Sequence, residues 1–367
     1  MTYSLRREQL AARLASVGAD AIVVSDLVNV RYLTGFTGSN AALLVFGDDR
    51  PPVLATDSRY RTQAARQAPG LEVAIERACG RYLVQRATAA GSERIGFESH
   101  IVTVDGYDAL QRALSGGGCA AAAELVRASG LVESLREIKD SGEVALLRRA
   151  CEAADAALAD VVSTGGLRPG RTERAVAREL EACMLDHGAD APAFETIVAA
   201  GANSAIPHHR PTDAVLHSGD FVKIDFGALV AGYHSDMTRT FVLGSAADWQ
   251  QEIYDVVFAA QHAGVAALEC GAELSGIDGA ARLVIDEAGF ADHFGHGLGH
   301  GVGLQIHEAP GISAAAVGSL RAGAVVTVEP GVYLPGRGGV RIEDTVLVSE
   351  HRIEPLSRFP KELTVLD

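Results

Sequence analysis

Residues 295–308 read Gly-His-Gly-Leu-Gly-His-Gly-Val-Gly-Leu-Gln-Ile-His-Glu, with a glycine at every odd position from 295 to 303. The spacing of His296 and His300 would suit two metal ligands on one face of a helix. A helix is excluded, because five interior glycines would cost it about 4–5 kcal/mol, at about 1 kcal/mol each. The two-residue period predicts an extended or looped segment whose even-numbered side chains, from 296 to 302, point the same way. The glycines let another backbone or a ligand come close.

A third histidine, His307, follows in the same stretch. The alternative interpretation is a glycine-rich connector with incidental histidines. Three histidines in this setting favour a functional site over that alternative.

The composition limits the class of protein. A chain of 367 residues suggests about two domains, each able to bury a core. The formal net charge of −15, with no run of basic residues, argues against a nucleic-acid or membrane-surface partner. Five scattered cysteines without a CxxC spacing are typical of a reducing compartment. Because no stretch approaches eighteen apolar residues, we expect a cytoplasmic protein without membrane spans.

Residues 1–128 are expected to form a smaller α/β domain that shapes a site supplied elsewhere. Residues 7–18 are amphipathic and predict a helix. Residues 29–36 are turn-prone, and residues 115–118 form the clearest loop. Apolar runs predict strands at Ala21–Ser25, Ala41–Phe46 and Pro52–Thr56.

Residues 129–367 contain an internal echo. Helical runs lie between Gly170 and Gly188 and between Gly271 and Gly289, and both glycine pairs are 18 residues apart. A long helix precedes each run, and two strand-like runs that contain acids follow it. We therefore expect a duplicated unit of two helices and two strands with a pseudo-twofold axis.

Four acids stand out on these strand-like runs. A hairpin centred on residues 230–231 would place Asp225 opposite Asp236, and the glycine-rich turn at 335–339 would place Glu329 opposite Glu343. Each acid alone is more often a solvated strand residue. Opposed acids on apolar strands need a cation, or one of each pair must keep its proton.

A set of four carboxylates and a histidine suits Mn²⁺, Fe²⁺, Co²⁺ or Zn²⁺ rather than a thiolate site. Four carboxylates around one divalent ion leave excess negative charge. Two ions about 3.5–4 Å apart would balance it and suit metal-assisted hydrolysis.

Five motifs hold these candidate ligands, in the order Ile224-Asp225-Phe226-Gly227, Ser235-Asp236-Met237-Thr238-Arg239-Thr240, Gly299-His300-Gly301-Val302-Gly303, Thr327-Val328-Glu329-Pro330-Gly331 and Arg341-Ile342-Glu343-Asp344-Thr345. The chain thereby resembles the pita-bread metallopeptidases, which include prolidase, aminopeptidase P and methionyl aminopeptidase. Residues 32–36 and 56–60 resemble the accessory domain of the prolidase and aminopeptidase P branch, which methionyl aminopeptidases lack. The resemblance implies an α+β fold: a pita-bread C-terminal catalytic domain with pseudo-twofold duplication, preceded by a smaller α/β N-terminal domain.

The resemblance also implies roles for single residues. The implied metal ligands are Asp225, Asp236, His300, Glu329 and Glu343, with Asp236 and Glu343 bridging two divalent ions per chain. Mn²⁺ is the first expectation for these ions, with Co²⁺, Fe²⁺ or Zn²⁺ as alternatives. The implied catalytic residues are His208, His307 and Glu329, and the implied substrate-binding residues are His296, Tyr333 and Arg341.

The expected activity is hydrolysis of the bond before proline in short peptides, as in an Xaa-Pro dipeptidase, by a homodimer. Two alternatives remain open: an aminopeptidase P that takes longer peptides, and a pita-bread protein that only binds. A dipeptidase must recognise the free carboxylate of proline. Arg337 and Arg210 are two candidates for that contact.

Overall fold

The structure is a computed structural model that describes residues 2–114 and 123–367. Contacts divide it into a first unit that ends at Arg136 and a second unit from Glu137 to Asp367. The loop expected at residues 115–118 lies outside the described residues. None of the helices in the described ranges has the length and apolar character needed to span a bilayer.

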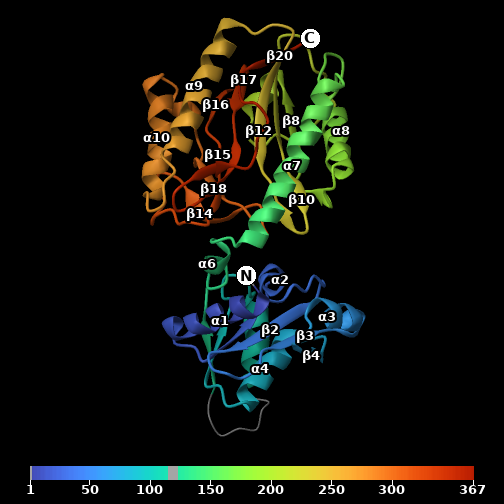
Figure 1. The fold of residues 1–367 in the computed structure, drawn as a ribbon, viewed down its shortest axis with the longest axis vertical. Coiled ribbons are helices and arrows are strands. Elements are labelled where there is room, and N and C mark those ends of the chain that lie inside the picture. Colours follow the sequence, from blue (N-terminus) through green and yellow to red (C-terminus); the bar gives the residue numbers. More distant parts are fainter. Residues whose placement is uncertain (1, 115–122) are drawn as a thin grey trace. The chain divides into compact units, whose positions relative to one another are not determined.

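The first unit is built on a six-stranded mixed sheet of order β4-β3-β2-β1-β5-β6 (Figure 1). The two central strands are wholly buried, which explains their continuous apolar sequences. The strands are β1 (Ala21–Val24), β2 (Ala41–Phe46), β3 (Val53–Thr56), β4 (Glu72–Ile75), β5 (Arg94–Phe97) and β6 (Glu124–Arg127). The helices are α1 (Tyr3–Arg13), α2 (Leu27–Thr34), α3 (Arg61–Gln67), α4 (Cys79–Ala89), α5 (Val104–Leu114) and α6 (Glu133–Arg136).

Helix α2 corrects the expectation of a turn-prone stretch at residues 29–36. The Asp26 side chain accepts a hydrogen bond from the Val28 amide and caps the helix. Inside the helix, Val30, Tyr32 and Leu33 are buried. Burial and the cap therefore outweigh the weak helix propensities of this segment.

The second unit places its strands between two pairs of helices, with α7 and α8 on one side and α9 and α10 on the other (Figure 1). The helices are α7 (Ser141–Ser163), α8 (Glu173–Asp186), α9 (Asp248–Ala266) and α10 (Leu274–Glu287). One four-stranded sheet has the order β20-β12-β9-β8, and a five-stranded sheet has the order β14-β13-β15-β18-β19. Their strands are β8 (Ile197–Ala200), β9 (Phe221–Phe226), β12 (Met237–Leu243), β13 (Gly299–Gly301), β14 (Glu308–Ile312), β15 (Val325–Val328), β18 (Asp344–Val348), β19 (Ile353–Pro355) and β20 (Thr364–Leu366).

Two smaller sheets complete the unit. They contain β7 (Ala191–Pro192), β10 (Ala228–Val230) and β11 (Tyr233–His234) in one, and β16 (Gly331–Leu334) and β17 (Gly338–Arg341) in the other.

The expected duplication is visible in matching backbone contacts. The Gly170 amide donates to Leu216 O at 2.9 Å, and the Gly271 amide donates to Leu320 O at 2.7 Å. The return bonds, from the amides of both leucines to the residue after each glycine, are both 2.8 Å. Each half also has its own hydrophobic core, one packed on α7 and α8 and the other on α9 and α10.

The predicted register agrees with the structure in the second hairpin but not in the first. Val328 pairs with Asp344 and Gly331 with Arg341, so Glu329 and Glu343 lie at opposite positions, as predicted. In the first hairpin Asp225 pairs with Thr238 and not with Asp236.

The first turn lies at Ala231 and Gly232, one residue later than expected. Both residues have positive φ, 48° and 83°, which matches the twist of a two-residue hairpin turn and favours glycine at 232. Moving the turn by one residue shifts the pairing by two residues, so each acid keeps its face of the sheet.

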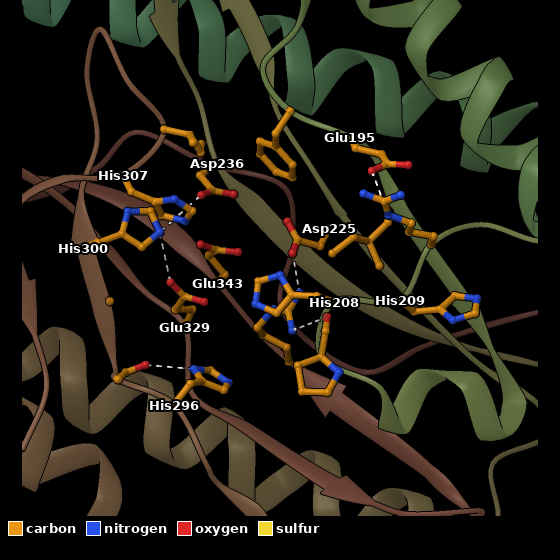
Figure 2. Close-up of a pocket in the computed structure, with 18 residues that line it drawn as sticks. Glu195, His208, His209, Asp225, Asp236, His296, His300, His307, Glu329 and Glu343 are labelled. Carbon is orange, nitrogen blue, oxygen red and sulfur yellow. Dashed lines mark hydrogen bonds and ion pairs between the residues drawn. The ribbon is translucent and has the colours of Figure 1, made fainter. Parts of the chain in front are cut away.

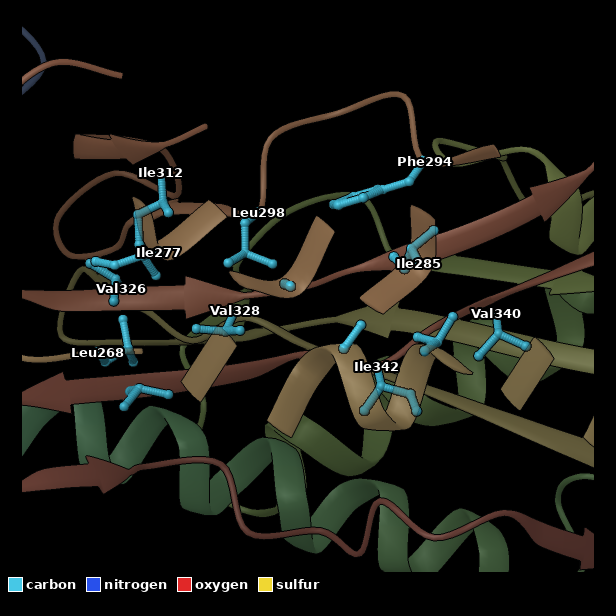
Figure 3. Packing of buried hydrophobic residues seen from close by; sticks show 14 of the residues in the cluster. Leu268, Ile277, Ile285, Phe294, Leu298, Ile312, Val326, Val328, Val340 and Ile342 are labelled. Carbon is cyan, nitrogen blue, oxygen red and sulfur yellow. The ribbon is translucent and has the colours of Figure 1, made fainter. Parts of the chain in front are cut away.

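The core on α9 and α10 extends under the glycine-histidine stretch (Figure 3). Leu298 is fully buried there with Ile277, Ile312 and Val328. Full burial of one such side chain contributes about 1.5–3 kcal/mol. The expectation that residues 296, 298, 300 and 302 all point one way is therefore wrong, because only Gly299–Gly301 is a strand and its pairing is irregular.

Candidate metal and substrate site

A pocket of about 430 Å³ in the second unit contains side chains from both halves (Figure 2). It brings together all five expected metal ligands and four of the five other expected site residues. Its titratable lining residues are Glu195, His208, His209, Arg210, Asp225, Asp236, His296, His300, His307, Glu329, Arg341 and Glu343. Tyr333, the remaining expected residue, lies behind this lining and is 7% exposed.

His300 is held by a strand that tolerates no side chains on either side of it. A Cβ atom at Gly299 would lie 2.0 Å from Thr327 O, and one at Gly301 would lie 2.1 Å from Ala309 O. The backbone of His300 is held in addition by its amide, which donates a hydrogen bond to Thr327 Oγ1 at 3.0 Å.

The tautomer of His300 follows from its contacts. Its Nδ1–H donates to Gly301 O at 3.0 Å, which leaves Nε2 facing the acids. Nε2 lies 3.3 Å from Glu329 Oε1 and 3.6 Å from Asp236 Oδ2. A metal-binding histidine is oriented in this way by the bond of its second nitrogen.

The acids are buried and close to one another. Asp236, His300 and Glu343 each offer a ligand atom, and these atoms lie within 4.8 Å of one another. Burial, and then the charges of neighbouring carboxylates, raise the pKa of both Asp236 and Glu343 well above the usual range. A divalent cation would compensate this repulsion.

Asp225 gives a second sign that a cation belongs here. Its Oδ2 accepts a hydrogen bond from Arg341, but its buried Oδ1 has no hydrogen-bond partner among the described residues. A buried carboxylate oxygen is normally satisfied, so this oxygen is suited to bind a cation. The residues present therefore fit a site for divalent metal.

Glu329 differs from the other acids. Burial alone would raise its pKa, but the hydrogen bond and charge of His300 outweigh burial and lower it. Thr327 Oγ1 also donates to Glu329 Oε1 at 3.0 Å. Glu329 is therefore ionised and able to accept a proton.

Two further histidines line the pocket beside the acids. The His307 ring lies edge to face against the His300 ring, with centroids 4.4 Å apart. Burial, and then the charge of His300, lower the pKa of His307. His208 lies in an exposed turn after β8 and faces the same pocket (Figure 2).

A hydrogen-bonded chain joins His296, Tyr333 and Arg341. Arg341 donates to the Tyr333 hydroxyl at 2.8 Å, and that hydroxyl lies 2.9 Å from His296 Nε2. Burial raises the pKa of Tyr333 to about 12, so its hydroxyl stays protonated and donates a hydrogen bond to Nε2 of His296. The Nδ1–H of His296 then donates to Gly297 O, and burial lowers the pKa of His296, so the ring is neutral.

Of the two arginines considered for binding the proline carboxylate, only one lines the pocket. Arg210 lines the pocket, with its Nε 3.2 Å from Glu195 Oε2. Arg337 instead stacks on Trp249, with its Cζ 4.2 Å from the ring centroid.

Sequence reasoning missed Glu173, the first residue of α8. It is fully buried and binds the segment that carries His208. An acid in the first turn of a helix usually serves as a cap, and its partners lie 27 to 39 residues away, so the sequence offered no signal.

Known proteins resemble this chain along its full length. A curated Xaa-Pro dipeptidase of Pyrococcus furiosus is 35% identical over 98% of this chain and 99% of its own. Among solved structures, an Xaa-Pro dipeptidase of Bacillus anthracis has a TM-score of 0.93 and 38% identity, and covers 100% of both chains. An X-Pro aminopeptidase of Thermotoga maritima has a TM-score of 0.87 and 32% identity, over 97% of this chain and 99% of its own.

Residues 6–138 match the creatinase/prolidase N-terminal domain, and residues 145–350 match a family of metallopeptidases. The predicted α+β fold, a pita-bread domain after a smaller α/β domain, is thereby confirmed. The family also confirms the expectation of an enzyme and implies divalent metal ions, which leaves no support for a protein that only binds. This chain belongs to metallopeptidase family M24.

Proposed function

We propose that this protein is an Xaa-Pro dipeptidase that uses two divalent metal ions. The observation that carries the proposal is a single pocket that holds three buried carboxylates, the partly buried Glu329, His300 and four further histidines. The likeness to Xaa-Pro dipeptidases over nearly the whole chain supports the same substrate class. We place the catalytic domain within residues 129–367 and the accessory domain within residues 1–128.

We assign metal binding to Asp225, Asp236, His300, Glu329 and Glu343, with Asp236 and Glu343 shared by both ions. The unpartnered Oδ1 of Asp225 and the raised pKa of the two shared acids support this assignment. Oxygen-rich donor sets favour hard ions, so we propose Mn²⁺ first, with Co²⁺, Fe²⁺ or Zn²⁺ as alternatives. When bound, such ions polarise a carbonyl and make water a nucleophile at neutral pH.

The catalytic residues would transfer the proton of the attacking water and stabilise the negative charge that develops on the carbonyl oxygen of the substrate. Glu329 takes the proton of the attacking water and delivers it to the leaving nitrogen. His307 and His208 donate hydrogen bonds to the oxyanion and the substrate amide. Both line the pocket on the side of the acids (Figure 2).

The substrate-binding residues would shape the proline subsite. The bond before proline has no N–H on the proline side, so the ring must be recognised largely by shape. Neutral His296 offers a flat wall, fixed by Tyr333 and Arg341. Arg210 is the pocket cation that we assign to the free carboxylate, because Arg341 is held in buried bonds to Asp225 and Tyr333, whereas the ion pair of Arg210 with Glu195 is exposed.

The second candidate is an X-Pro aminopeptidase, favoured by the likeness to the Thermotoga maritima enzyme. The two activities separate when Ala-Pro, Ala-Pro-Ala and Ala-Ala are compared at equal concentration with protein supplied with each metal in turn. We expect Ala-Pro to have the highest kcat/KM and Ala-Ala to be a poor substrate. A much higher value for Ala-Pro-Ala would establish the aminopeptidase instead.

We also propose a cytoplasmic homodimer. The four described cysteines, Cys79, Cys151, Cys183 and Cys270, are all free thiols, which suits a reducing compartment. The dimer is an expectation from the family resemblance, and sedimentation of the purified protein would test it.

A further inference from the structure

The pocket segment that carries His208 is fastened to one buried carboxylate. Glu173 Oε1 accepts hydrogen bonds from the Ala200 amide and from Asn203 Nδ2, both at 2.9 Å. Its Oε2 accepts from the Thr212 amide at 2.9 Å and from the Thr212 hydroxyl at 2.7 Å. The fifth partner is His209 Nε2, at 2.8 Å.

These five bonds enclose the segment on both sides. Ala200 and Asn203 precede His208, His209 adjoins it, and Thr212 follows it. Glu173 itself sits on α8, whose first-turn amides are bonded to Thr212 O and Ala214 O. The turn is therefore tied to a rigid helix at its start, its middle and its end, although His208 itself is exposed.

The bond with His209 also fixes a tautomer. Because a carboxylate can only accept, His209 must carry its proton on Nε2. The His209 ring is 9% exposed and is thereby turned into the protein, while its neighbour His208 faces the pocket (Figure 2). Both histidines line the pocket, but His209 is buried and anchored to Glu173, whereas His208 is exposed.

We propose that Glu173 is a positioning residue that, through His209 and the backbone of residues 200–212, fixes His208 in the active-site pocket. This inference rests on the proposed function, in which His208 contacts the substrate. A displacement of about 1 Å in such a group can cost about 10²-fold in rate. A residue that acts only as a helix cap would affect folding without acting through His208.

The test compares Glu173→Gln with Glu181→Gln, which removes the same charge further along the same helix. The amide of glutamine presents donor hydrogens where the segment needs an acceptor, while the volume is kept. We expect Glu173→Gln to lower kcat on Ala-Pro by about 10- to 100-fold with bound metal unchanged and KM altered less, and Glu181→Gln to match the wild type.

A double-mutant cycle shows whether the effect passes through His208. In a His208→Ala background, Glu173→Gln should lower kcat by less than about 2-fold, because the group it positions is gone. An equal loss in both backgrounds overturns the proposal. If Glu173→Gln fails to fold, Thr212→Val enters the same cycle; it removes the hydroxyl bond to Glu173, and with it the bond from the Ala214 amide, at nearly constant shape.

Hydrogen–deuterium exchange gives a readout that does not depend on activity. Residues 200–212 should exchange faster in Glu173→Gln than in the wild type, while residues 274–287 of α10 serve as an internal reference. Unchanged exchange in residues 200–212 overturns the positioning role. A wild-type protein that cleaves no Xaa-Pro peptide would overturn the proposed function instead, and the exchange experiment would still decide the role of Glu173.

Discussion

The half of the second unit that contains α7 and α8 supplies Asp225 and Asp236 to the pocket, whereas the other half supplies His300, Glu329 and Glu343. Both halves use the same glycine and leucine contacts to join helix and strand. The scaffold has thus kept its duplication, while the side chains in the pocket have diverged. Two acids from each half face one another, and the histidine ligand comes from one half alone.

The halves also differ in how they fasten their pocket segments. In the first half, Glu173 binds residues 200–212 directly. In the second half, Asp278 on α10 accepts a hydrogen bond from the Leu298 amide at 3.1 Å and another from the Arg282 guanidinium. Arg282 in turn donates to Phe294 O and His296 O. One buried acid on the second helix of each pair is therefore bonded, directly or through an arginine, to a segment that carries a pocket histidine.

The largest expected effect tests whether the two halves share their ions. Asp236→Ala removes an acid of the first half, and Glu343→Ala removes one of the second. Since each is assigned to both ions, each variant should lose both, and hydrolysis of Ala-Pro should fall to the limit of detection. Elemental analysis should fall from about two equivalents towards zero. Full activity of either variant would refute the shared-ligand assignment.

The next effect separates two neighbouring histidines of the second half. His307→Ala should lower kcat by about 10²–10⁴-fold with metal content intact, as expected for loss of a proton-transfer or oxyanion group. His300→Ala should lose metal as well. Exposed His351 provides the control, since His351→Ala should change neither quantity. Equal metal loss in the two variants would contradict this division of roles, and metal loss in the His307 variant alone would show that the roles are reversed.

Asp236 and Glu343 meet where the two halves face one another. Removing the metal should make the stability of the protein depend on the pH at which these two acids ionise. In the metal-free protein the pKa of Asp236 and of Glu343 is raised, so the folded chain keeps protons that the unfolded chain releases near pH 4. Their stabilising contribution is full below about pH 4 and is lost as pH rises through the folded pKa values.

Calorimetry of chelated and metal-loaded protein between about pH 5 and pH 8 checks this sign. Each loss of about 1 kcal/mol should lower Tm by about 2–4 °C in a unit of this size. We expect Tm of the chelated protein to fall across this range and that of the loaded protein to stay nearly level. A Tm that rises with pH in the chelated protein would contradict the buried-acid account.

The smallest expected effect concerns the anchor of the second half. Asp278→Asn weakens the hold on Leu298 and Arg282, which should loosen His296 in the proline subsite. We expect KM for Ala-Pro to rise by about 2- to 10-fold, the equivalent of one hydrogen bond, with kcat nearly unchanged. Exposed Asp286 on the same helix provides a matched Asp286→Asn control. A fall in kcat without a change in KM would place His296 outside the subsite.

Much of this site could be predicted because its residues lie on regular strands. The register of the second hairpin followed from a glycine-rich turn that has few alternatives. The first hairpin could not be placed as well, because its turn begins with Ala231, and alanine rarely adopts a positive φ. Family resemblance supplied the five candidate ligands independently of either register.

Features that depend on distant partners could not be predicted. Helix α2 forms because Val30 and Leu33 find a core that local propensity does not show. Leu298 turns away from its histidine neighbours because the segment is too irregular for strict alternation. Glu173 is recognised only when the loop that it binds is folded against it.

The two glycines that flank His300 have a consequence for protein engineering. Positions 299 and 301 leave no volume for a Cβ atom, so a mutant library that samples them would lose the metal ligand with nearly every substitution. Gly295 and Gly311 are different, because an added Cβ at either position meets nothing within 4 Å. A mutant library around His300 can therefore vary positions 295 and 311 but should leave 299 and 301 unchanged.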